Sequence, residues 1–119
     1  MPNSTQEFLT KLAAKRGELG RQLPPLQHYE KFKKTIYQGK NLTIKEKALI
    51  ALAIAVVKQC KYCITVHLKE AIEAGANDGE IFEACGVAIL MGGGPALGYT
   101  TFVQEALADL RNISQEANV

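Results

Sequence analysis

Two cysteines and a histidine fall within the segment QCKYCITVH, residues 59–67. Cys60, Cys63 and His67 are spaced three and then four residues apart, so on a helix they would lie along one face. An i,i+3 cysteine pair at the start of a helix is close enough to form a disulfide. His67 would reach the Cys63 sulfur directly or through one water. The spacing indicates redox chemistry, a metal site, or a cysteine pair buried beside a histidine.

The metal and buried-pair interpretations have the weaker support. Free cysteine is often buried as a small hydrophobic residue, but the neighbours Lys61 and Tyr62 indicate a segment near the surface. Structural zinc needs four ligands, and the fourth would have to be Cys85 or His28, neither of which lies in a matching half-site. The glycine run at 92–94 follows no strand, which argues against nucleotide binding. We therefore predict no metal site and no cofactor.

The redox interpretation depends on forming a thiolate, which is the reactive form of cysteine. The positive end of a helix dipole favours a thiolate at Cys60. His67 can instead accept or relay a proton from Cys63. These two clues nominate different sulfurs. In either case one thiol would attack a substrate and the other would resolve the product as an intramolecular disulfide.

Capping signals and apolar spacing predict an all-α fold that positions this segment. Ser4 with Glu7, and Thr43 with Glu46, form capping boxes at the starts of two helices. The expected helices begin near Ser4, Pro24, Thr43, Tyr62, Asn77 and Pro95, and they end near Gly20, Gly39, Val57, Gly75, Met91 and Arg111. We expect the last eight residues to be frayed. About six helices would form a compact bundle, with both cysteines at the start of a central helix.

The length of 119 residues fits one domain, with N-terminal helices in residues 1–42 and the core in residues 43–111. The apolar run Ala48–Val57 is too short to cross a bilayer, so it is expected to be buried in the monomer or at a subunit interface. The net charge of +2 and the short basic stretch 31–34 argue against nucleic-acid binding. Without a visible secretory signal we expect a cytoplasmic protein.

The stretch KEKALIALAIAVVKQCKYCITVHLKEAIEAGANDGEIFEACGVAILMGGGPA resembles the carboxymuconolactone decarboxylase family, in its alkylhydroperoxidase AhpD-like branch. The resemblance covers residues 43–110 and centres on C-x-x-C-x-x-x-H within a helical hairpin. It implies an all-helical AhpD-like fold, trimers or hexamers, and thiol-dependent reduction of hydroperoxides. It further implies that Cys63 attacks the peroxide, that Cys60 resolves the product, and that His67 belongs to the proton relay.

One position departs from the family pattern. AhpD-like members usually carry a glutamate twelve residues before the first cysteine, whereas this chain has Ala48 there. Glu46 is two residues away, on a different side of the helix, and we expect it to cap the helix instead. Glu83 is the candidate that could supply the carboxylate, and its alternative role is that of a solvated surface residue. Without such a carboxylate the relay would be incomplete and peroxidase activity weak.

These observations predict a thiol-dependent peroxidase or disulfide reductase with a catalytic set of Cys63, Cys60, His67 and Glu83. Its partners would be a hydroperoxide or disulfide substrate, a dithiol electron donor and further copies of itself, with no nucleic acid and no membrane. One alternative is the family's lactone decarboxylation, which has no evident need for two thiols. Another is a non-enzymatic helical oligomer whose thiols sense redox state or hold a metal.

Overall fold

The computed structural model describes the backbone of residues 3–117 and the side chains as far as residue 112. Within that range the chain forms six helices and no strand, which confirms the predicted all-α fold. The helices are α1 (Ser4–Gln22), α2 (Leu26–Tyr37), α3 (Ile44–Val57), α4 (Lys61–Glu73), α5 (Asp78–Gly92) and α6 (Gly94–Ala117). None of the helices in this part of the chain combines the length and apolar character that crossing a bilayer requires.

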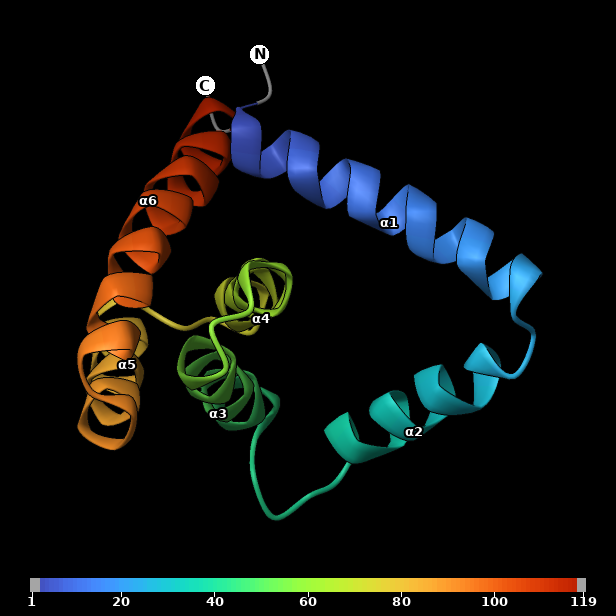
Figure 1. Ribbon diagram of the computed structural model, residues 1–119, viewed down its shortest axis with the longest axis horizontal. Coiled ribbons are helices and arrows are strands. Elements are labelled where there is room, and N and C mark those ends of the chain that lie inside the picture. The colour runs from blue at the N-terminus through green and yellow to red at the C-terminus, as the bar shows by residue number, and fades with distance from the viewer. Residues whose placement is uncertain (1–2, 118–119) are drawn as a thin grey trace.

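The hairpin of α3 and α4 lies at the centre of the molecule (Figure 1). α5 and α6 pack against one side of this hairpin, while α2 lies on the other side. α1 begins beside the C-terminal part of α6 and runs away from it, and α2 then returns the chain toward α3 (Figure 1). The helix that begins at the two cysteines is therefore central, as the sequence predicted.

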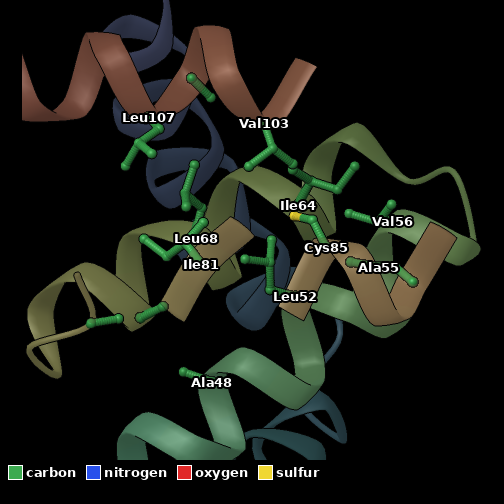
Figure 2. Packing of buried hydrophobic residues seen from close by; sticks show 14 of the residues in the cluster. Ala48, Leu52, Ala55, Val56, Ile64, Leu68, Ile81, Cys85, Val103 and Leu107 are labelled. Carbon is green, nitrogen blue, oxygen red and sulfur yellow. The ribbon is translucent and has the colours of Figure 1, made fainter. Parts of the chain in front are cut away.

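The hydrophobic core is built mainly by α3, α4, α5 and α6, with Ala76 of the loop between α4 and α5 (Figure 2). Its largest fully buried apolar side chains are those of Leu52, Ile64, Leu68, Ile81, Val56 and Val103. Burial of such side chains contributes about 1.5–3 kcal/mol each, so these four helices fix one another strongly. α1 and α2 contain no fully buried residue. Fewer apolar contacts therefore hold these two helices in place.

Two of the predicted helix starts follow from local capping. Thr43 and Glu46 exchange side-chain-to-backbone hydrogen bonds of 3.0 and 2.9 Å, so the predicted capping box of α3 is present. Asn77 caps α5 in the same way with Glu80. The predicted break between the last two helices is also observed, because α5 ends at Gly92 and α6 starts at Gly94.

The capping box predicted for Ser4 and Glu7 is wrong by one residue. Asn3 is the N-cap of α1, and its side-chain oxygen accepts a hydrogen bond from a backbone amide of the first turn. Its amide nitrogen also donates to the carbonyl oxygen of Asp109 at 2.9 Å, and the Thr5 hydroxyl donates to the Asp109 carboxylate at 2.6 Å. Asn caps as well as Ser does, so the contacts with α6 decide between them.

Two helix ends also differ from expectation. α1 continues through Gly20 to Gln22, because one glycine weakens a helix by only about 1 kcal/mol. The following Pro24 disfavours helical geometry in the residue before it and so sets the end. α6 continues past Arg111 to Ala117, where no glycine or proline interrupts it.

Candidate functional site

A tight turn between α3 and α4 positions the first cysteine. The amide of Gln59 donates to the carbonyl of Val56 at 3.1 Å, and the amide of Cys60 donates to that of Ala55 at 3.2 Å. This pair of bonds is a Schellman motif, which ends a helix on a left-handed residue. Gln59 occupies that position with a φ of 57°, where glycine is usual. The chain re-enters a helix at once, so Cys60 becomes the N-cap of α4.

The two cysteines lie close enough to form a disulfide. Their Cα atoms are 5.3 Å apart, within the range that disulfide bonds span. The Sγ atom of Cys60 also accepts a hydrogen bond from the backbone amide of Cys63 at 3.2 Å. Free amides and the helix dipole at the start of α4 favour negative charge on this sulfur. In the reduced state they would favour a thiolate at Cys60.

The two residues between the cysteines attach the first turn of α4 to other helices. The ring of Tyr62 packs against Phe8 of α1, with centroids 5.1 Å apart. The ammonium of Lys61 lies 5.1 Å from the ring centroid of Phe102 on α6, a cation–π contact. The C-x-x-C turn is therefore held from two sides, and each contact contributes about 0.5–1.5 kcal/mol.

A carboxylate lies next to the histidine. Nδ1 of His67 is 3.0 Å from Oε2 of Glu70, three residues further along α4. Lys33 on α2 donates to Oε1 of the same carboxylate at 2.7 Å. The hydroxyl of Tyr37, also on α2, lies 3.4 Å from Oε2. Glu70 therefore links the histidine of the central helix to α2.

The charge state of Glu70 determines which nitrogen of His67 carries a hydrogen. Burial raises the pKa of the Glu70 carboxyl, but the hydrogen bonds and charges of His67 and Lys33 outweigh burial and lower that pKa to about 2. The ionised carboxylate has no hydrogen to donate, so Nδ1 of His67 must be the donor. In the neutral imidazole Nε2 is then unprotonated and can accept a proton. Burial and Glu70 also raise the pKa of the Tyr37 phenol, to about 12.

The second cysteine and the histidine open into one hollow. Cys63 and His67 both line a cavity of about 610 Å³, which also touches α1, α2 and α3. This volume is within the range of small-molecule sites. Cys60 does not line the hollow, and its sulfur faces the amide at the start of α4 instead. The two thiols therefore differ in their access to a ligand bound in this hollow.

The sequence-predicted site residues do not all lie in one place. The structure brings Cys60, Cys63 and His67 together on α4. Glu83 is exposed on α5 and does not line the hollow. Glu70, which was not predicted, supplies beside His67 the carboxylate that was expected from Glu83. The signal that could have found it is its i,i+3 spacing from the histidine.

The other positions singled out in the sequence have structural roles or are exposed. Glu46 belongs to the capping box of α3, and its hydrogen bonds with Thr43 lower its pKa. Ala48, at the place of the family's glutamate, is fully buried in the core. Cys85 is buried on α5, and burial raises the pKa of its thiol. In the described part of the chain no three His, Cys, Asp or Glu side chains gather as metal ligands would.

The amino-acid sequence also resembles known sequences. An uncharacterized protein of Cupriavidus necator is 32% identical over 102 residues, which cover 85% of this chain and 90% of that protein. An uncharacterized protein of Haemophilus influenzae is 45% identical over 56 residues, covering 46% of this chain. That match spans only half of the Haemophilus protein's length.

Solved structures share the fold over most of their length. A Thermotoga maritima carboxymuconolactone decarboxylase family protein, for which a role in the antioxidative response has been suggested, superposes with a TM-score of 0.72 and 28% identity. The match covers 76% of this chain and 94% of that one. A Legionella pneumophila protein of the same family gives a TM-score of 0.70 with 34% identity, covering 92% of this chain and 93% of its own.

One protein family accounts for the order of the helices, the C-x-x-C turn and these relatives. The sequence matches the carboxymuconolactone decarboxylase family over residues 25–106. This match includes the whole of α3, α4 and α5, and therefore both thiols and His67. Because it spans more than half of the chain, this protein belongs to the carboxymuconolactone decarboxylase family.

Proposed function

We propose that this protein is a thiol-dependent peroxidase of the AhpD-like type. The observation that carries the proposal is the pairing of two thiols at disulfide distance with a hollow that exposes only the second one. The suggested antioxidative role of the Thermotoga relative agrees with this chemistry. Hydroperoxides are the substrates, and an external dithiol returns the enzyme to its reduced state.

Cys63 is the attacking residue in this proposal. Nε2 of His67 takes the proton of the Cys63 thiol, and the thiolate attacks the terminal oxygen of the hydroperoxide. The O–O bond breaks, the alcohol leaves with the proton held by His67, and Cys63 becomes a sulfenic acid. The Cys60 thiol then attacks that sulfur, which forms the disulfide and releases water. Two thiols and one hydroperoxide thus give one disulfide, one alcohol and one water.

The surroundings of each cysteine support attack by Cys63 and resolution by Cys60. Cys63 lines the hollow together with His67, whose unprotonated Nε2 can accept the proton of the thiol. Cys60 lies within one helical turn of Cys63 and can reach its sulfur. Cys85 is buried on another helix, and its raised pKa keeps it in the unreactive thiol form.

A hydroperoxide consumption assay with dithiothreitol as donor tests the proposal, with each cysteine replaced in turn. We expect Cys63→Ser to abolish consumption, because no attacking thiolate remains in the hollow. With dithiothreitol left out, Cys60→Ser should consume about one equivalent and then stop as a sulfenic acid, because neither a resolving thiol nor an external one is present. Cys85→Ser is the matched control and should retain the rate. Equal rates in all three variants would reject the assignment.

A further inference from the structure

The walls of the hollow beside Cys63 combine a long apolar surface with positive charge. Ile36, Leu42, Ile50 and Ile54 line it, and each of these side chains is 43–53% exposed. Large apolar side chains that remain open to solvent around one hollow are typical of a site for an apolar ligand. These aliphatic side chains, together with the rings of three tyrosines, give the hollow an apolar lining that a hydrocarbon chain can cover.

Among the side chains that the structure describes, those of Arg16, Lys33 and Lys47 bring positive charge to the same hollow, and no carboxylate lines it. Arg16 pairs with Glu30 at 2.6 Å, and Lys33 pairs with Glu70 at 2.7 Å. The third cation is Lys47, and among the described residues it takes part in no ion pair. A positive charge in an apolar wall favours an anionic group on the ligand.

Two hydrogen bonds hold the ammonium of Lys47 in place and leave one of its N–H donors unused. The ammonium donates to the carbonyl oxygens of Ile36 at 2.7 Å and of Gly39 at 3.0 Å, where α2 ends. A lysine ammonium has three N–H donors, so one donor remains. The two carbonyl bonds fix the nitrogen beside the hollow without neutralising its charge. A ligand carboxylate can therefore accept the third hydrogen bond of the Lys47 ammonium.

The charge and the thiol lie toward opposite ends of the hollow. Lys47, Ile50 and Ile54 follow one face of α3, and seven residues of helix span about 10 Å. The tight turn at Gln59 brings the start of α4 back beside the end of α3, so Cys63 lies near the Ile54 end. A ligand that touches both must therefore separate its reactive group from its charge by roughly this distance.

We infer that this hollow selects fatty-acid hydroperoxides, with Lys47 binding the carboxylate while the peroxide reaches Cys63. The inference rests on the proposed peroxidase function and adds the substrate class to it. The thiol pair reduces the fatty-acid hydroperoxide to the hydroxy acid and water, as in the balanced reaction above. An apolar chain covers the aliphatic walls, and the ion pair sets the orientation of the substrate.

The test compares the 9-hydroperoxide of linoleic acid with its methyl ester, both below their micelle-forming concentrations and with dithiothreitol as donor. The two substrates share the chain and the peroxide, and they differ only at the carboxyl end, where the ester is uncharged and carries a methyl group. We expect kcat/KM to favour the free acid about tenfold, as one charge-assisted hydrogen bond would produce. Lys47→Met should bring this ratio close to one, whereas Lys47→Arg should restore most of it.

The readout is the ratio of kcat/KM for the acid to kcat/KM for the ester, because general damage to the site lowers both values and leaves their ratio unchanged. Lys31→Met is the matched control, since Lys31 is an exposed lysine of α2 that does not line the hollow. It removes the same charge and should keep the preference for the acid. Binding of linoleate and of methyl linoleate, followed by tyrosine fluorescence, gives a second readout that needs no turnover.

The possible failures can be told apart. Equal kcat/KM for acid and ester in the unaltered protein would overturn the inference and leave the peroxidase proposal intact. A preference that survives in Lys47→Met would overturn the role of Lys47. If cumene hydroperoxide is not consumed either, the peroxidase proposal itself fails. In that case equal binding of linoleate and methyl linoleate would overturn the selection of a carboxylate as well.

Discussion

Nδ1 of His67 lies 3.0 Å from Oε2 of Glu70, so α4 presents a thiol, an imidazole and a carboxylate along one helix. Cys63, His67 and Glu70 are spaced four and three residues apart, which brings them onto neighbouring turns. Lys33 holds the carboxylate from α2 at 2.7 Å. The position of α2 is thereby linked to the histidine that faces the hollow.

His67→Ala should slow alkylation of Cys63 by iodoacetamide near neutral pH. General-base assistance is worth about a hundredfold or more in rate, and the variant lacks the group that takes the thiol proton. The loss should shrink at higher pH, where the thiol ionises without help. Rates of alkylation measured against pH give the pKa of the thiol. An unchanged pKa together with a lowered melting temperature would show that His67 is a packing residue.

Glu70→Gln should slow peroxide reduction while substrate binding stays close to normal. The glutamine side chain is uncharged, so it holds the Nδ1–H of His67 less strongly than the carboxylate does. A smaller fraction of the molecules then has an unprotonated Nε2 that can accept a proton. We expect about a tenfold lower kcat and a shifted pH profile. Glu73→Gln is the control, because Glu73 is an exposed glutamate of the same helix that pairs with Lys69. Equal losses in the two variants would contradict a positioning role for Glu70.

The same carboxylate should make stability depend on pH in the acid range. The folded-state pKa of Glu70 is about 2, below its ordinary value of 4.5. Its stabilising contribution is therefore complete above about pH 4.5 and is lost as the pH falls toward 2. Allowing for partial solvent exposure, Glu70→Gln should cost about 1–2 kcal/mol at pH 6 and almost nothing near pH 2. Urea unfolding of both proteins at several pH values measures this, and a constant difference would contradict it.

Mild oxidation should remove two thiols per chain and leave the third. Cys60 and Cys63 lie at disulfide distance, whereas Cys85 is buried on α5. Treatment with one equivalent of hydroperoxide, alkylation and peptide mass spectrometry should find the first two linked and the third alkylated after unfolding. A bridge between Cys85 and either partner would reject the pairing.

We propose that the chain assembles as a trimer or hexamer. Near the end of α5 the side chains of Leu90 and Met91 are 80% and 77% exposed, and those of Val87 on the same helix and Leu97 on α6 are exposed as well. Apolar side chains of this size are rarely left open over a contiguous surface in a monomer. Multi-angle light scattering should give a multiple of the chain mass, and Leu90→Lys should reduce it. A stable monomer at micromolar concentration would refute the proposal.

Local chemistry along the sequence determined the helices and the spacing of the reactive groups. Hydrogen bonds at helix starts close within about four residues, so the capping box of Thr43 with Glu46 and a helix start near Asn77 could be predicted. Gly75, with a φ of 93°, ends α4 for the same local reason. Once α4 is a helix, the intervals of three and four residues place Cys60, Cys63 and His67 along one face.

Only the tertiary structure decided which groups surround these three residues. Lys33 and Glu70 are 37 positions apart, and they meet because the chain brings α2 back toward α4. The spacing of residues along the chain predicts neither that contact nor the exposed position of Glu83 on α5. The hollow, and the charge of Lys47 within it, likewise depend on how α1 and α2 stand away from a core that four other helices build. Such arrangements follow from burial summed over distant residues, which the order of residues along the chain does not display.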